Sequence, residues 1–194
     1  MTLSVRLSAT DDEVQVLTEP IVRVYREAFS RPPYARGQRE VADFAFSFGR
    51  HMDREGFRLA VAYDERGNTV LGFAFGYTAR PGQWWYDQVA AALSPQAVTR
   101  WLTGGFELAE LAVTPRAQGR GLGGRLHDTL LAGLPHRTAV LSTMALETVA
   151  TRLYCKRGWI PLVDELYFAG VEQPYCIMGL DLDAGRPARP SIQD

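Results

Sequence analysis

The sequence has little cysteine, almost no net charge and no long apolar run. Two cysteines among 194 residues are too few for a disulfide framework, which agrees with a reducing compartment. The net charge of -1 offers no field that would attract nucleic acid or anionic lipid. No apolar run approaches the ~20 residues that span a bilayer, and residues 1–6 lack the order of a signal peptide. We therefore expect a cytoplasmic protein with no nucleic-acid or membrane partner.

Signs of a metal centre or of a serine nucleophile are missing as well. The three histidines, His51, His127 and His136, show no ligand spacing with each other or with the cysteines. No Gly-x-Ser-x-Gly elbow occurs. We expect no metal, and we interpret Cys155 as a packing residue, because it points away from its helical neighbour Tyr154.

What the chain does have is a succession of short β and α patterns. Leu3, Val5 and Leu7 alternate with polar residues as in a half-buried strand, and Thr10-x-x-Glu13 has the form of a helix capping box. Further along, Pro20 suits the first turn of a helix over residues 21–29, and Val41, Phe44, Ala45 and Phe48 have the spacing of a second amphipathic helix.

The rest of the chain predicts an α/β (α+β) fold. We expect a hairpin of strands 58–63 and 70–78 with a polar turn at 64–68, short helices within 80–104, a strand at 106–113, a helix at 122–132, a strand at 139–142, a helix at 146–156, and strands at 160–168 and 175–182. These elements make a mixed central sheet of about six or seven strands flanked by helices. A single domain over residues 1–183 is expected, followed by a frayed tail at 184–194.

The most informative segment is a glycine-rich loop between a predicted strand and a predicted helix. It contains Gly119, Gly121, Gly123 and Gly124. Such a loop brings backbone N–H groups close to an anion, and the helix N-terminus adds a partial positive charge. The loop therefore predicts a phosphate-binding site.

Two other phosphate motifs fit this loop less well. Gly119-x-Gly121-x-x-Gly124 matches the dinucleotide fingerprint, but residues 114–118 separate it from the strand and no carboxylate follows about 20 residues later. A P-loop would need Gly-Lys-Ser/Thr, whereas the only lysine, Lys156, lies in another predicted helix. A dinucleotide-binding protein is kept as the third hypothesis.

Two segments resemble motifs of the GNAT superfamily of acyl-coenzyme A N-acetyltransferases. The first, similar to its acetyl-coenzyme A signature, is Leu111-Ala112-Val113-x-Pro115-x-x-Gln118-x-x-Gly121-x-Gly123. The second, similar to its later helix motif, is Ala150-x-x-Leu153-Tyr154-x-Lys156-x-Gly158-Trp159. The signature also fits as Arg116-x-x-Gly119-x-Gly121, but we prefer the Gln118 register, whose last glycine lies at the start of the periodic helix. The resemblance covers about residues 106–160.

The resemblance implies a GNAT fold that moves an acetyl or related acyl group from acetyl-CoA to a primary amine by direct attack. The acceptor is a small-molecule amine or a peptide or protein amine, and a homodimer is compatible with the family. The implied coenzyme A contacts are Leu111, Ala112, Val113, Gln118, Gly119, Arg120, Gly121, Leu122, Gly123 and Glu147. At Glu147 the family often has asparagine, so this contact is lost or mediated by water.

The resemblance also implies catalytic roles. Tyr154 matches the tyrosine near the cofactor sulfur and is assigned as the general acid. Glu107 and Glu110 are both candidates for the base, and strict strand alternation puts them on opposite faces unless a bulge intervenes. The aromatic run at residues 84–86 lines an acceptor pocket, stacks on a cationic ligand, or is a packing element that covers the sheet edge. A different class of function, a non-catalytic acyl-CoA-binding module, is the alternative.

Overall fold

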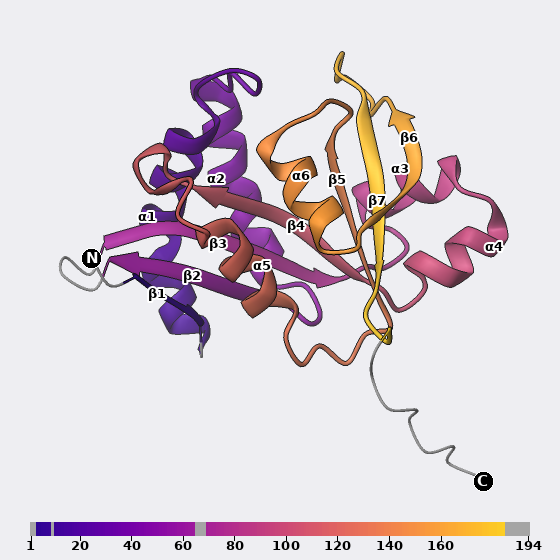
Figure 1. The fold of residues 1–194 in the computed structure, drawn as a ribbon, viewed down its shortest axis with the longest axis horizontal. Coiled ribbons are helices and arrows are strands. Elements are labelled where there is room, and N and C mark those ends of the chain that lie inside the picture. Colours follow the sequence, from indigo (N-terminus) through magenta and orange to yellow (C-terminus); the bar gives the residue numbers. More distant parts are fainter. Residues whose placement is uncertain (1–2, 9, 65–68, 185–194) are drawn as a thin grey trace, which may run out of the picture. The chain divides into compact units, whose positions relative to one another are not determined.

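The computed structural model describes residues 3–8, 10–64 and 69–184. Within these ranges seven strands form a mixed sheet in the order β1-β2-β3-β4-β5-β7-β6, flanked by six α-helices (Figure 1), which confirms the predicted fold class. The strands are β1 (Leu3–Leu7), β2 (Arg58–Asp64), β3 (Thr69–Thr78), β4 (Phe106–Val113), β5 (Thr138–Met144), β6 (Ile160–Leu166) and β7 (Tyr175–Asp181). The helices are α1 (Asp11–Phe29), α2 (Gln38–Met52), α3 (Trp84–Ala92), α4 (Pro95–Ala97), α5 (Leu122–Leu131) and α6 (Val149–Lys156).

The chain divides into two compact units. The first contains Met1–Thr78 and Glu107–Leu134, and the second contains Ala79–Phe106 and Pro135–Asp194. Most of the predicted polar turn, residues 65–68, and all but the first residue of the predicted tail lie outside the described residues.

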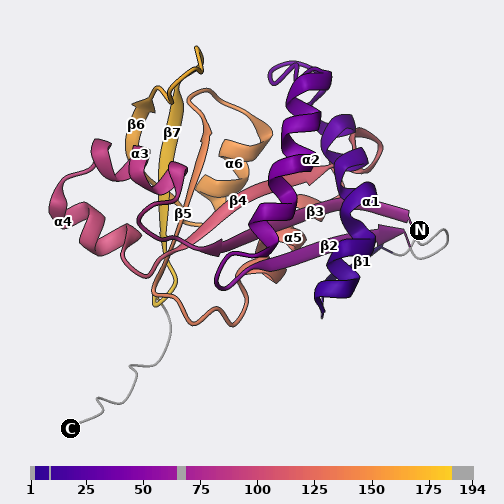
Figure 2. The same cartoon turned by 180° about the vertical axis from the view of Figure 1, so that it is seen from behind.

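The first unit is a layered structure built on the predicted hairpin. β1 pairs with β2 and β2 with β3, all antiparallel. Helices α1 and α2 lie on one face of these strands and α5 on the other (Figures 1 and 2). The core under α1 and α2 is strongly aromatic, because every second residue of β3 from Phe73 to Tyr77 points into it beside Phe44 and Phe48.

Helix α1 begins as predicted but continues through Pro20. Thr10 caps it, and its Oγ1 accepts the Glu13 N–H at 3.2 Å. The prediction that Pro20 starts a separate helix is wrong, since Pro20 lies inside the helix. A proline there removes a helical hydrogen bond, and the burial of Leu17, Ile21 and Val24 on both sides of it offsets that loss.

Gly72 lies at a bulge in β3 and at a close approach to β4. Ala62 pairs with Gly72 while Tyr63 pairs with Val70, so β3 carries one extra residue there. A Cβ on Gly72 would lie 2.9 Å from the Ala112 carbonyl oxygen. The absence of a side chain at Gly72 therefore lets β3 and β4 fit together in this unit.

This contact predicts opposite effects for two glycine-to-alanine changes. Gly72→Ala is expected to lower the free energy of unfolding by about 2 kcal/mol, because a backbone oxygen cannot yield to the new methyl group. Gly49→Ala, in α2 with no neighbour within 4 Å of the added Cβ, should raise it by about 0.5 to 1 kcal/mol. Urea denaturation followed by circular dichroism measures both. Equal effects of the two changes would contradict this account of Gly72.

The second unit contains the antiparallel strands β5, β7 and β6. Residues 80–104, expected to hold short helices, form α3, α4 and a π-helical turn at Val98–Leu102, and Ser94 caps α4 by accepting the Ala97 N–H at 3.2 Å. Helix α6 begins three residues later than predicted, because Thr148 caps it by accepting the Thr151 N–H at 3.1 Å. In the parts of the chain that are described, no helix is long and apolar enough to cross a membrane.

Candidate active site

The predicted phosphate loop connects β4 to α5 in the first unit. After β4 comes a short 3-10 turn at Pro115–Ala117, and then Gly119 and Gly121 take left-handed φ angles of 72° and 75°. The Gln118 side chain ties this loop back to the strand, since its Nε2 donates to the Val113 carbonyl oxygen at 2.9 Å. Only glycine adopts such angles without strain, so the loop shape follows from these two residues.

The start of α5 has the features of an anion site. Gly121 is its N-cap residue and supplies no side-chain acceptor for the first N–H groups of the helix. A Cβ added to Gly119 or Gly121 would meet nothing within 4 Å, so the space beside both glycines is open on the protein side. Uncapped N–H groups, a helix dipole and open space together fit a pyrophosphate. Arg116 and Arg120 are exposed on the same loop.

Strand β4 does not keep the alternation expected of it. Ala109 and Ala112 both pack against the aromatic core of the first unit, although residues three apart on a regular strand face opposite sides. The alternation of β4 is therefore broken between Ala109 and Ala112, and strict alternation does not fix which faces Glu107 and Glu110 share. Leu111 is half-buried beside this break, and Ala112 and Val113 are buried.

Glu107 lies in the centre of a buried cluster. It is 4% exposed, and its Oε1 accepts a hydrogen bond from the Tyr77 hydroxyl at 3.0 Å. Oε2 has no hydrogen-bond partner among the described residues. Burial raises the pKa of Glu107 to about 7, while the Tyr77 hydrogen bond and the Arg54 charge act in the opposite direction. Glu107 therefore gains and loses a proton near neutral pH.

His51 near the end of α2 and Arg54 just after that helix both contact the Tyr77 ring. The His51 ring stacks on it with centroids 5.2 Å apart and planes within 10°, and the Arg54 guanidinium lies 4.3 Å from the ring centroid. Burial lowers the pKa of His51 to about 4, helped by the charges of Arg54 and Arg50, so His51 is neutral at pH 7. Burial and the Glu107 charge hold the pKa of Tyr77 above its usual range, so its hydroxyl remains a donor.

Glu110 is the second carboxyl group of this strand. Burial raises its pKa to about 7, and the Arg36 charge and the Leu111 backbone N–H oppose that rise. The residue as a whole is half-buried, so it is more accessible than Glu107. Both predicted base candidates therefore titrate near pH 7. They differ in exposure, since Glu107 is buried and Glu110 is half-buried.

Sequence reasoning missed the partners of Glu107. Tyr77 follows Phe73 and Phe75 at strand spacing and so has the pattern of a core aromatic, and His51 was considered only as a metal ligand. No local pattern marks a hydroxyl that meets a carboxylate 30 residues away.

The remaining predicted site residues, Tyr154 and Glu147, belong to the second unit. Tyr154 on α6 is 6% exposed and packs against Trp159, with ring centroids 5.7 Å apart. Its neighbour Cys155 points away from it, as expected, but is exposed, so the interpretation of Cys155 as a packing residue is wrong. Glu147 is exposed and forms an ion pair with Arg152 at 3.0 Å.

The aromatic run at residues 84–86 is divided between core and surface. Trp85 and Tyr86 are buried in the second unit, where Trp85 Nε1 donates to Ser142 Oγ at 3.0 Å. Trp84 is 55% exposed and lies against Phe168. Two of the three rings are therefore packing elements. Across the described residues, no group of three or more histidine, cysteine, aspartate or glutamate side chains could hold a metal ion.

Comparison with known proteins identifies the family. The model of the acetyltransferase (GNAT) family matches residues 19–159. A GCN5-like protein acetyltransferase of Mycobacterium tuberculosis is 40% identical over 121 residues, which are 58% of this chain and 59% of that protein. The chain therefore matches that relative over about three fifths of the relative's length.

Solved structures share the fold at low sequence identity. A Corynebacterium glutamicum protein described as "histone acetyltransferase HPA2 and related acetyltransferase" is 20% identical with a TM-score of 0.64, covering 99% of this chain and 100% of that one. An Escherichia coli ribosomal-protein alanine N-acetyltransferase is 16% identical with a TM-score of 0.62, covering 100% of both chains. Because the family model matches well over half of the sequence, the chain belongs to the acetyltransferase (GNAT) family.

Proposed function

We propose that this chain is an acetyl-CoA-dependent N-acetyltransferase that moves the acetyl group to a primary amine by direct attack. The observation that carries the proposal is the glycine loop at the start of α5, with its left-handed Gly119 and Gly121, in the same unit as the buried carboxyl group of Glu107. An anion site and a base of suitable pKa are what this reaction requires.

The donor would be held mainly by backbone groups. In this proposal the main chain of Leu111, Ala112 and Val113 contacts the pantetheine arm, and residues 118–123 bind the pyrophosphate through N–H groups. The Val113 carbonyl already accepts the Gln118 side chain, so it is not available to the donor. Glu147, held by Arg152, would contact the donor only through water.

The chemistry needs a base, a polarised carbonyl and an acid. Glu107 takes a proton from the acceptor ammonium, the neutral amine nitrogen bonds to the thioester carbon, and the C–S bond breaks. The nitrogen then loses its second proton, which replaces the one that Tyr154 gives to the thiolate. The Leu111 N–H would stabilise the developing oxyanion once it no longer bonds the Glu110 carboxyl group, and Tyr154 would protonate the departing thiolate. We assign the base to Glu107 rather than Glu110, because Glu107 is the more deeply buried and keeps one oxygen without a partner.

A protein amine is the acceptor that we propose. The support is the Mycobacterium tuberculosis relative, which is named a protein acetyltransferase and is 40% identical over the matched segment. The acceptor of this chain would then be a lysine side chain or an N-terminus on a protein surface.

The test is a thiol-release assay with acetyl-CoA and a panel of lysine peptides, N-terminal peptides and small amines. Turnover with peptides is the expected result. Turnover with small amines alone would replace the proposed acceptor. Silence throughout the panel, with micromolar binding of acetyl-CoA by calorimetry, would favour the non-catalytic module, and binding of NAD without coenzyme A would favour a dinucleotide protein.

The acid assignment gives a separate prediction. Tyr154→Phe should lower kcat by roughly 10- to 100-fold, because the thiolate then leaves without a positioned proton donor, while acetyl-CoA affinity stays within about twofold. Tyr86→Phe is the matched control, since both tyrosines are 6% exposed in the same unit. Equal kcat values for the two variants would indicate that Tyr154 only packs in the core and is not the general acid.

A further inference from the structure

The two carboxylate oxygens of Glu107 have different surroundings. Oε1 accepts the Tyr77 hydroxyl at 3.0 Å, and both residues are buried, at 1% and 4% exposure. Oε2 is buried too and has no partner in the part of the chain that is described. A buried carboxylate oxygen without a hydrogen bond is costly, so folded proteins rarely keep one without use.

Tyr77 is itself held in one orientation. The His51 ring of α2 stacks on it and the guanidinium of Arg54, just after α2, lies near its ring centroid, so the phenol is confined by these two side chains as well as by its own strand. Its hydroxyl therefore meets Glu107 in a fixed direction, and the Glu107 side chain is fixed in turn. The bond joins β3 to β4, across 30 residues of sequence.

We propose that Tyr77 is a positioning residue, whose hydroxyl holds Oε1 of Glu107 so that Oε2 is the oxygen that accepts the proton of the acceptor amine. This inference rests on the proposed function. One N–H bond of the ammonium breaks, its proton forms an O–H bond at Oε2, and the freed electron pair attacks the thioester carbon. Tyr77 keeps its own proton throughout and touches neither reacting atom.

The charges around the pair define how the proposal is tested. Tyr77 and Arg54 both favour the ionised form of Glu107, His51 is neutral, and Glu110 is the other carboxyl group whose charge reaches Tyr77. Removing the Tyr77 hydroxyl withdraws a hydrogen bond from the carboxylate and leaves the burial unchanged. The pKa of Glu107 should then rise above about 7.

The experiment is the pH dependence of kcat/KM for Tyr77→Phe in the full chain. We expect kcat/KM at pH 7 to fall by roughly 10- to 100-fold, the limb of the profile to move to higher pH, and the KM for acetyl-CoA to stay within about twofold. A role in packing alone would not move the profile, because phenylalanine keeps the ring on which His51 and Arg54 rest.

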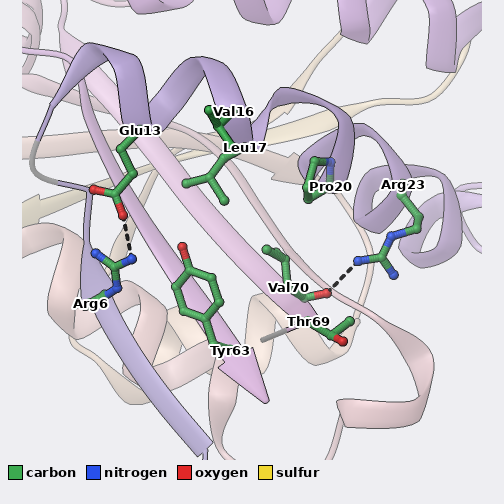
Figure 3. Close-up of a pocket in the computed structure, with 9 residues that line it drawn as sticks. All are labelled: Arg6, Glu13, Val16, Leu17, Pro20, Arg23, Tyr63, Thr69 and Val70. Carbon is green, nitrogen blue, oxygen red and sulfur yellow. Dashed lines mark hydrogen bonds and ion pairs between the residues drawn. The ribbon is translucent and has the colours of Figure 1, made fainter. Parts of the chain in front are cut away.

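Tyr63→Phe is the matched control. Tyr63 is a second buried tyrosine of the same unit, and it lies beside Arg6, whose guanidinium is 5.1 Å from the ring centroid, in the hollow beside α1 (Figure 3). Arg6 pairs there with Glu13, so the surroundings are similar but contain no proposed catalytic group. Its pH profile should match that of the wild type.

A second measurement keeps the inference decidable if Tyr77→Phe does not fold. Incorporation of 3-fluorotyrosine at position 77 retains the shape of tyrosine and makes the hydroxyl a stronger donor, so the apparent pKa should fall. Active protein whose profile is unmoved by either replacement overturns the positioning role while the proposed function stands. An inactive wild type that binds acetyl-CoA overturns the proposed function, and carbon-13 NMR titration of Glu107 still reports whether Tyr77 sets its pKa.

Discussion

Replacing Gly121 with valine is expected to weaken acetyl-CoA binding by at least about 100-fold, as measured by calorimetry, while the protein stays folded. Valine disfavours the φ angle of 75° by about 1–2 kcal/mol and places two methyl groups beside the uncapped N–H groups of α5. No protein atom lies within 4 Å of the added Cβ, so the new side chain collides with the ligand rather than with the fold.

Gly133→Val separates this effect from backbone strain. Gly133 has a φ of 67°, also has nothing within 4 Å of an added Cβ, and lies in the same unit at the other end of α5. The two variants should lose similar stability in thermal melts, and only Gly121→Val should lose the ligand. If Gly121→Val bound acetyl-CoA as tightly as the wild type, the glycine loop would not be part of the donor site.

The second large effect is expected at the proposed base. Glu107→Gln should lower kcat/KM by roughly 1000-fold at pH 7.5, within the range for loss of a general base. Glutamine has the same size, and its amide oxygen still accepts the Tyr77 hydroxyl, so the loss would report the missing proton acceptor. Steady-state thiol release measures it, and acetyl-CoA affinity by calorimetry should be unchanged.

The pH dependence identifies which carboxyl group acts. The wild-type kcat/KM should rise with pH and level off above about 7, the pKa to which burial raises Glu107. Glu110→Gln is the matched variant, because Glu110 lies on the same strand with a pKa raised to about 7. It should keep the profile and lose less than about tenfold in rate. A large loss in Glu110→Gln alone would assign the base to Glu110.

Stability should change in the opposite direction from activity. The pKa of Glu107 is higher in the folded chain than its ordinary value of 4.5, so the folded state holds its proton more tightly. The contribution of Glu107 to the free energy of unfolding therefore falls by about 1.4 kcal/mol per pH unit as pH rises from 4.5 to 7, and it stays reduced above that. Glu107→Gln removes this group's contribution, so at pH 8 the variant should be at least as stable as the wild type.

Local patterns predicted most of the elements, because their causes lie within a few residues. The alternation at Leu3–Leu7 and the Thr10 cap required no distant contact. The start of α5 followed the glycine loop in the same way. Where the prediction failed, distant packing was responsible. Proline disfavours the interior of a helix because it lacks a backbone N–H. Helix α1 nevertheless continues through Pro20, because apolar residues on both sides of it are buried.

The sequence by itself determined the glycine loop, since left-handed angles at Gly119 and Gly121 and a helix start beside them are local properties. It also predicted Glu107 and Glu110 as candidates for the base, but it offered no reason to prefer one of them. Only the tertiary structure distinguished them. The buried Tyr77 bond and the burial of Glu107 depend on how β3, β4 and the neighbouring residues pack in one unit. A pKa is set by such surroundings, which residues distant in the sequence provide.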